Sequence, residues 1–543
     1  MHSFNWQNPY PSIHTPVFAR NVVATSHPLA AQAGVRMLLR GGNAVDAAVA
    51  GAAMMILVEP VSCGLGGDCF AIVWDGRKLH GLNASGGAPA AWNVDYFKRK
   101  YGVDGHGLAI QPRHGWDTVT VPGVVAGWAA LHEKFGKLPF ADLFEPAIEV
   151  AERGHVLTPF VVAKWTRTFA DLRGQPGFAA AFLPRGRAPH VGEKFILQGA
   201  AQTLRRIAQT RGRDLYEGES AERIAAFSRE GDGAMTADDL RAYRPEWVAP
   251  LAKDYHGHTL HELPPNGQGI AALMAMGIAR HFDLQDLPVD SVESQHIQIE
   301  ATKLAFADLY RYTADPRSME AVTPADLLDD AYLASRAKLL RRDRALHFEP
   351  GRPAAGGTIY LAAADESGMM VSFIQSNYMG FGSGVVVPDT GISLQNRGVG
   401  FSMDPRSPNV VAGGKRPFHT IIPGFLTRAG KPVMAFGVMG GDIQPQAHLQ
   451  TLVRLVDYHQ QPQAACDAPR WKVNADFSVD TEQGMNPETI QGLKALGHVV
   501  NPNNGNYVEF GAGQFVWKLA DDDPDMGYVA ASDPRRDGQA AGF

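Results

Sequence analysis

The chain changes from helix-forming to strand-forming sequence near residue 341, and this change restricts the folds that it can adopt. Before that point, apolar residues recur at helical spacing in Leu29–Arg40, Ala44–Val58, Gly123–Phe135, Pro139–Arg153, Ser294–Asp308 and Pro324–Leu340. The charged stretch Arg341–Arg352 follows, then Ala354–Gly357, and both are typical of an exposed, flexible linker. The chain is therefore expected to contain helices mainly before the linker and strands mainly after it.

Immediately after the linker, two apolar and β-branched runs predict a β-hairpin. They are Thr358–Ala364 and Met369–Gln375, with Asp365–Gly368 as the turn. Further strands are expected at Gly384–Val387, Thr420–Leu426, Val433–Gly437, Tyr507–Phe510 and Gln514–Leu519.

The hairpin opens with Gly356–Gly357–Thr358. A threonine hydroxyl is a weak nucleophile, but it becomes useful when its own α-amine is free and acts as a base. That chemistry requires cleavage of the bond before Thr358. Spacing alone does not decide the matter, because a threonine at the start of a strand is usually an ordinary β-former.

Charge and composition exclude several classes of protein. The 543 residues include 50 basic and 56 acidic side chains, so the formal balance is 50 − 56 = −6. Without a basic block, a dedicated nucleic-acid binder is disfavoured. No basic segment followed by a long apolar run opens the chain, and no stretch reaches the roughly 18 apolar residues of a membrane span, so we expect a cytoplasmic protein without a membrane partner.

The sequence predicts neither a metal nor any other cofactor. The three cysteines, Cys63, Cys69 and Cys466, fit neither a zinc site nor a redox motif and are expected in the core. His256, His258 and His261 cluster, but alternation places only the first two on one face, which indicates an edge strand. The glycine clusters match no nucleotide-binding loop.

A series of motifs runs in order along nearly the whole chain. They read GLGGDCF (Gly64–Phe70), VPGVVAGW (Val121–Trp128), LPPNGQG (Leu263–Gly269), EATKLAFAD (Glu300–Asp308), GGTIYLAAADESG (Gly356–Gly368), KRPFHTIIP (Lys415–Pro423), GVMGGDIQP (Gly437–Pro445) and ASDPRRDGQAAGF (Ala531–Phe543). This ordered set resembles the γ-glutamyltransferase family of N-terminal-nucleophile hydrolases.

The resemblance implies an α+β fold, a four-layer αββα sandwich, and a precursor that cuts itself between Gly357 and Thr358. Cleavage would give a large subunit, residues 1–357, and a small subunit of 543 − 357 = 186 residues, 358–543. The two subunits would stay together as one domain, and a larger assembly of the pair is left open.

The resemblance also implies roles for individual residues. Thr358 would be the nucleophile and its α-amine the base, while Ser376 would supply a hydroxyl that hydrogen-bonds the nucleophile. Gly440 and Gly441 would form the oxyanion hole. Their structural alternative is an ordinary turn after a strand. The acyl-enzyme would be hydrolysed by water or transferred to an acceptor amine.

The pocket departs from the transferase pattern. Ser85 stands where the family has its carboxylate-binding arginine, and Gly400 replaces the acidic residue that holds the substrate amine. His419 and Thr420 replace a serine pair, while Tyr378 and Arg397 replace an asparagine and a glutamine. We therefore expect weak or absent γ-glutamyl activity.

Arg397 and His419 could instead form an anion site for a shorter acid, although a structural ion pair and a packed core histidine are the alternatives. The sequence looks closer to a cytoplasmic side branch of the family that includes acylases and an oxamate amidohydrolase. It predicts an amidohydrolase acting on a small acidic acyl compound. The other options are a γ-glutamyltransferase or glutathione hydrolase, a glutaryl-cephalosporin-type acylase, and a processed but inactive binding protein.

Overall fold

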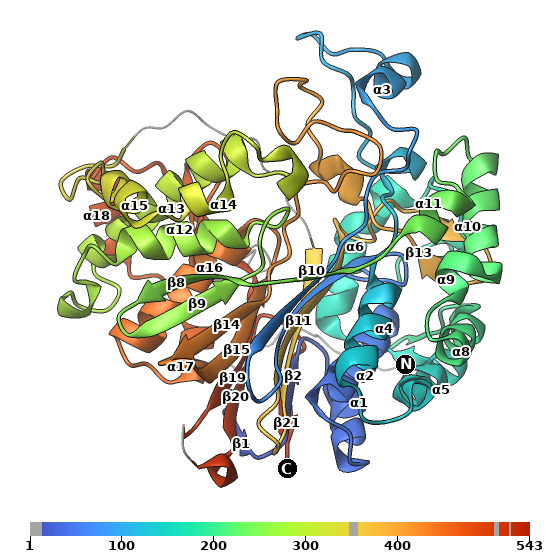
Figure 1. Cartoon of the computed structure of the whole chain (residues 1–543), viewed down its shortest axis with the longest axis horizontal. Helices are drawn as coiled ribbons and strands as arrows, with labels where there is room; N and C mark the ends of the chain where they lie inside the picture. The colour runs from blue at the N-terminus through green and yellow to red at the C-terminus, as the bar shows by residue number, and fades with distance from the viewer. Residues whose placement is uncertain (1–13, 347–356, 504–509, 521–522) are drawn as a thin grey trace.

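In the computed structural model, two seven-stranded sheets lie face to face, and helices cover both outer sides (Figure 1). The structure describes residues 14–346, 357–503, 510–520 and 523–543. Helices α1, α2, α4 and α5 lie on one side, and α12, α13 and α15 on the other. The predicted αββα sandwich is confirmed.

The first sheet holds the strand that begins at the Gly-Thr junction. Its order is β21 (Gln539–Gly542), β2 (Val22–Thr25), β10 (Gly357–Ala364), β11 (Met370–Tyr378), β3 (Asp68–Trp74), β4 (Leu79–Ala84) and β7 (Glu246–Val248). All neighbours are antiparallel. Strand β10 therefore lies between one strand from the start of the chain and its own hairpin partner.

The second sheet follows the order β1 (Val17–Ala19), β20 (Tyr528–Ser532), β19 (Ala512–Lys518), β15 (Lys431–Met439), β14 (Gly424–Arg428), β9 (His258–Glu262) and β8 (Leu251–Tyr255). Its neighbours are also antiparallel. Small paired strands lie outside the two sheets: β5 (His155–Val156), β6 (Lys194–Phe195), β12 (Val386–Val387), β13 (Ile392–Ser393), β16 (Trp471–Val473), β17 (Val479–Glu482) and β18 (Val500–Asn503).

The helices that cover the first sheet include α1 (Pro28–Leu39), α2 (Ala44–Val58), α4 (Val124–Phe135) and α5 (Glu145–Arg153). Those on the second include α12 (Gly269–Ala279), α13 (Val292–Tyr312), α15 (Asp330–Ala337), α16 (Ile443–Leu452) and α18 (Pro487–Ala495). The other helices are α3 (Val94–Tyr101), α6 (Pro159–Leu172), α7 (Phe178–Phe182), α8 (Ala200–Thr210), α9 (Asp214–Glu217), α10 (Glu219–Glu230), α11 (Ala237–Ala242), α14 (Pro324–Leu327) and α17 (Pro462–Asp467). No helix among the described residues is both long and apolar enough to pass through a membrane.

Helix α2 shows why small residues recur in the first half of the chain. Every residue of it is buried, and Asn43 caps its N-terminus in a reciprocal arrangement with Asp46. At Gly51 a Cβ atom would lie 2.6 Å from the Leu361 side chain of β10. The glycine thus lets the helix approach the strand closely and fixes the depth of β10 in the core.

Most predicted elements are confirmed, with shifted ends. The structure divides the predicted helix Pro139–Arg153 into a 3-10 turn and α5, and it divides Pro324–Leu340 into α14 and α15. The prediction of a strand over Thr420–Leu426 is wrong in its first half. β14 begins at Gly424, because the Ile422 N–H donates to the Gln444 side chain and the Thr420 carbonyl accepts from Gln268, rather than either group pairing with a strand. The predicted strand Tyr507–Phe510 lies largely outside the described residues.

The first residues of the predicted linker, 341–346, are fixed to helix α13, and residues 347–356 lie outside the described residues. The described part of the linker ends at Leu346, whose N–H donates to Glu300 of α13 at 2.8 Å. The carbonyl of Arg341 lies 2.6 Å from Nε2 of His296, one helical turn earlier. The chain is therefore anchored to α13 directly before the part that is not described.

Candidate active site

Thr358 and Ser376 face each other at the open end of the β10–β11 hairpin. Ser376 lies on the same face of β11 as Ile374, which packs between the two sheets. The Thr358 side chain is buried, and its Oγ1 donates to Ser376 Oγ at 3.4 Å. Ser376 Oγ also accepts the Tyr378 N–H at 2.7 Å. The structure thus brings together the two hydroxyls that the sequence predicted would meet.

Gly440 and Gly441 form the turn between β15 and α16, beside the hairpin. Both have positive φ, 140° and 72°, a region that favours glycine. A Cβ at Gly440 would lie 2.9 Å from the Gly511 backbone. The Gly441 carbonyl accepts a hydrogen bond from Gln268 Nε2 at 2.8 Å, which braces the turn.

Gln444 is a site residue that the sequence reasoning missed. It lies in the first turn of α16 and is fully buried, and its Nε2 is 3.5 Å from Thr358 Oγ1. It therefore connects the glycine turn to the threonine hydroxyl. The sequence signal that could have identified Gln444 was a polar residue just after the paired glycines. The structure adds that every residue of its helix is buried.

Arg397 is completely buried beside the hairpin end. Its guanidinium lies 4.2 Å above the Tyr378 ring, and Nη1 donates to Thr420 Oγ1 at 3.0 Å. Nε and Nη2 have no hydrogen-bond partner in the described part of the chain. Burial lowers the pKa of Arg397 to about 10, against the opposing charge of Asp68. Because unpaired buried donors are costly, these two groups indicate a place for an anion.

Asp68 provides the counter-charge, and the sequence reasoning missed it as well. Its Oδ2 lies 4.0 Å from Arg397 Nε and 3.0 Å from His419 Nε2, while Gln395 donates to its Oδ1 at 3.0 Å. Burial raises the pKa of Asp68 to about 7, although Arg397 opposes the shift. The residue lies within the quoted motif GLGGDCF, but nothing local linked it to a histidine 351 positions later.

His419 is a neutral donor rather than a cation. Burial, together with the nearby Arg397 charge, holds the pKa of His419 well below its usual range. Its Nδ1 accepts the Ile421 N–H at 3.4 Å, so the proton is on Nε2 and points to Asp68. The imidazole thus supports the acid that balances Arg397.

Among the described residues, the Ser85 side chain makes no hydrogen bond to Arg397 or Asp68, and it is bound to two asparagines instead. Its Oγ donates to Asn83 at 2.7 Å and accepts from Asn266 at 3.3 Å. The Asn266 carbonyl in turn accepts the His419 N–H at 2.9 Å. Ser85 therefore supports the His419 backbone through Asn266.

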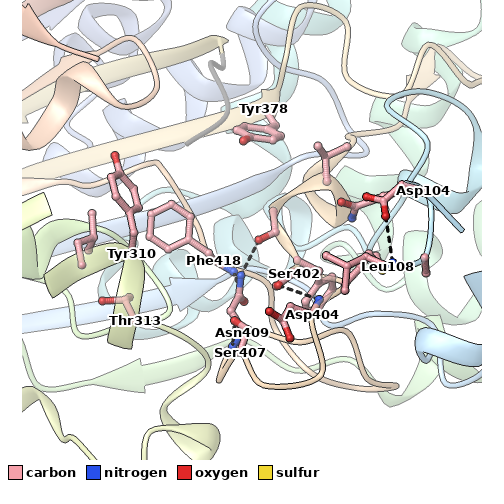
Figure 2. Close-up of a pocket in the computed structure, with 17 residues that line it drawn as sticks. Asp104, Leu108, Tyr310, Thr313, Tyr378, Ser402, Asp404, Ser407, Asn409 and Phe418 are labelled. Atoms are coloured by element: carbon pink, nitrogen blue, oxygen red, sulfur yellow. Dashed lines mark hydrogen bonds between the residues drawn. The ribbon is translucent and has the colours of Figure 1, made fainter. Parts of the chain in front are cut away.

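A pocket of about 420 Å³ opens beside Tyr378 (Figure 2). Its wall includes Gly400, Tyr310 of α13 and Thr313, which directly follows that helix. The hydroxyls of Tyr310 and Thr313 have no hydrogen-bond partner among the described residues. The volume lies within the range of pockets for drug-sized ligands, which is about 300–1,000 Å³.

One group of side chains has the composition of a metal site. His296, Glu300 and His498 each place a ligand atom within 4.8 Å of the others. The Lys303 ammonium, however, donates to both Glu300 and His498 at 3.0 Å. His498 lies 2.7 Å from His296, so the four side chains form one hydrogen-bonded chain. The histidines of the β8–β9 hairpin do not converge, because His256 contacts Asp457 and His261 contacts Thr427.

Comparison with known proteins agrees with this geometry. Residues 30–543 match the family model described as gamma-glutamyltranspeptidase. The chain belongs to the gamma-glutamyltranspeptidase family. It is accordingly an enzyme of the amide-hydrolase type, as the sequence predicted.

Several relatives are similar along their whole length. The glutathione hydrolase-like YwrD proenzyme of Bacillus subtilis is 35% identical, over 96% of this chain and 98% of the relative. The oxamate amidohydrolase proenzyme of Klebsiella pneumoniae is 34% identical, over 97% and 99%. The crystal structure of a cephalosporin acylase from Bacillus halodurans superposes with a TM-score of 0.94 at 44% identity, covering 100% of this chain and 99% of that one.

Proposed function

We propose that this protein cuts itself between Gly357 and Thr358 and then hydrolyses amides whose acyl group carries a carboxylate. The observation that carries the proposal is the buried Arg397, whose Nε and Nη2 have no hydrogen-bond partner among the described residues. It stacks on Tyr378, the residue paired with Gly357 across the hairpin. The proenzyme names of two relatives support the cleavage.

In the self-cleavage step, Thr358 Oγ1 attacks the Gly357 carbonyl, the peptide C–N bond breaks, and the hydroxyl proton ends on the released nitrogen. The peptide thereby becomes an ester with a free α-amine. Water then hydrolyses the ester, which leaves the large subunit with a free C-terminal carboxylate while both subunits remain in the same two sheets. In turnover, the same oxygen attacks the substrate carbonyl while the α-amine takes its proton and passes it to the leaving amine. Backbone N–H groups of Gly440 and Gly441 stabilise the oxyanion, and water finally hydrolyses the acyl-enzyme.

The pocket supports a small acidic acyl group of the oxamate kind. A γ-glutamyl group would need a cation and an anion to hold its carboxylate and amine, yet Ser85 and Gly400 stand at those two positions. Arg397 supplies one cation, close to the reacting end of the hairpin. The carboxylate of oxamate lies next to its scissile carbonyl, which suits a single, nearby guanidinium.

An acylase that releases a bulky amine is the second candidate, and the size of the pocket favours it. About 420 Å³ is far more than a molecule such as oxamate fills. The space would accept a large leaving group, as in the cephalosporin acylase to which this chain is similar. A cytoplasmic location stays a prediction from the sequence.

Two experiments test the proposal. On a denaturing gel the wild-type protein should run as chains of 357 and 186 residues, and Thr358→Ala as one chain of 543. A single full-length wild-type band would refute the cleavage. Amine release should then be measured in parallel from oxamate, a glutaryl amide and γ-glutamyl p-nitroanilide. A strong preference for the γ-glutamyl compound would contradict the substrate class.

A further inference from the structure

We propose that the side-chain amide of Gln444 is a further catalytic group, which donates a hydrogen bond to the Thr358 oxygen as that oxygen loses its proton. The inference rests on the proposed role of Thr358 as nucleophile. Gln444 Nε2 lies 3.5 Å from Thr358 Oγ1, and both side chains are buried.

The orientation of the Gln444 amide is fixed by the backbone. Its Oε1 accepts the Ile422 N–H at 3.0 Å. Because a backbone N–H can only donate, the oxygen end of the amide must face Ile422. The NH₂ end therefore faces Thr358, and Gln444 acts on the threonine oxygen as a donor.

The hydrogen bonds around Thr358 Oγ1 give that donor a chemical purpose. The Thr358 hydroxyl has one hydrogen, which it donates to Ser376 Oγ at 3.4 Å. The Gln444 amide therefore donates to a lone pair of the Thr358 oxygen. When the hydroxyl is deprotonated for attack, negative charge develops on this oxygen. Hydrogen bonds to charged acceptors are roughly twice as strong as neutral ones, so the contact tightens as the nucleophile forms. The same step occurs in self-cleavage and in turnover.

The position of Gln444 is also coupled to the anion site. Ile422 lies two residues after Thr420, whose hydroxyl accepts a hydrogen bond from Arg397 Nη1. Gln268 Nε2 donates to the Thr420 carbonyl at 2.5 Å and to the Gly441 carbonyl at 2.8 Å. The segment 420–422 thus positions both Gln444, which donates to the Thr358 oxygen, and Arg397, the proposed cation for the acyl carboxylate.

Helix α16 offers a matched control. Gln446 lies two residues after Gln444 and is also fully buried, and its side-chain amide likewise binds backbone groups. Its Oε1 accepts the Val473 N–H at 2.7 Å, and its Nε2 donates to the Val473 carbonyl at 3.1 Å. Those contacts are made to β16, and Nε2 also donates to the Asp442 carbonyl at 3.1 Å, just before the start of α16. Because Gln446 makes no hydrogen bond to Thr358 among the described residues, Gln446→Leu removes an equivalent buried amide without removing a donor to the nucleophile.

The test compares Gln444→Leu, Gln444→Glu and Gln446→Leu. The rate of conversion of the full-length chain into two chains should be measured on gels, and kcat after conversion is complete. We expect both Gln444 variants to be slowed about 100-fold in each step, as for loss of one preorganised donor. Gln446→Leu should stay within about threefold of wild type in both steps.

The pH dependence of the Gln444→Glu rate distinguishes a hydrogen-bond donor from a residue with a merely structural role. A protonated carboxyl can donate, whereas a carboxylate cannot. The rate of Gln444→Glu relative to wild type at the same pH should therefore rise on acidification, and that of Gln444→Leu should stay constant. A pH-independent ratio for Gln444→Glu would overturn the inference. Wild-type rates in both Gln444 variants would also overturn it, as would an equal loss in Gln446→Leu.

Thr358→Ala separates this inference from the proposal beneath it. If Thr358→Ala still yields two chains, the proposed function fails. If Thr358→Ala is blocked while the Gln444 variants convert at the wild-type rate, only the role of Gln444 fails.

Discussion

Replacement of Arg397 by methionine should remove the preference for anionic acyl groups. Methionine keeps an unbranched side chain against the Tyr378 ring and loses the charge and every donor. Arg397 is fully buried, and its Nε and Nη2 have no hydrogen-bond partner among the described residues, so a bound carboxylate would supply the missing hydrogen bonds. We expect the loss to appear in kcat/KM for acidic substrates.

The size of the effect follows from the surroundings of Arg397. Truncating one partner of a buried, hydrogen-bonded charge pair costs about 2–5 kcal/mol. Asp68 already balances part of the charge from 4.0 Å, so the lower half of that range applies. About 2–3 kcal/mol corresponds to a fall of roughly 30- to 140-fold in kcat/KM.

The assay compares two chromogenic amides with the same leaving group, glutaryl p-nitroanilide and butyryl p-nitroanilide. They differ in the acyl carboxylate, so Arg397→Met should slow the first and spare the second. Arg397→Lys keeps the charge but loses the planar fork, and it should fall between methionine and wild type. Equal losses on both substrates would refute the reasoning, because Arg397 would then act on the scaffold alone.

Three further predictions follow from the same geometry. Burial raises the pKa of Asp68 to about 7, so inhibition by glutarate should weaken above that pH, by at most about tenfold per unit. Asp68→Asn should flatten this profile, since His419 beside it is neutral. Gly440→Ala should lower kcat about 100-fold or more, because a Cβ there meets the Gly511 backbone; an unchanged kcat would exclude the glycine turn from the reaction. Tyr310→Phe with Thr313→Val removes two pocket hydroxyls that have no hydrogen-bond partner in the described part of the chain, and it should raise KM for amides with polar leaving groups and leave p-nitroanilides unaffected.

What could be predicted from the sequence was mostly local. Thr358 and Ser376 are 18 residues apart in one hairpin, so strand pairing brings them together. The glycine turn is likewise a local signal. Asp68 and Gln444 reach their partners only through the packing of distant segments, and their residue types are compatible with many other roles. The substrate pocket depends on such contacts and therefore needed the structure.

The position of β2 in the first sheet has a consequence for the synthesis of the chain. This strand ends at residue 25, yet its two neighbours are β10 and β21, which ends at residue 542. The Asn21 N–H even donates to the Phe543 carbonyl. A ribosome must therefore translate as far as residue 542 before β2 has both partners. The large fragment made alone would leave β2 without either neighbour and β3 without β11, and such unpaired edges are templates for aggregation. Separately expressed halves should thus be recovered only when they are translated together.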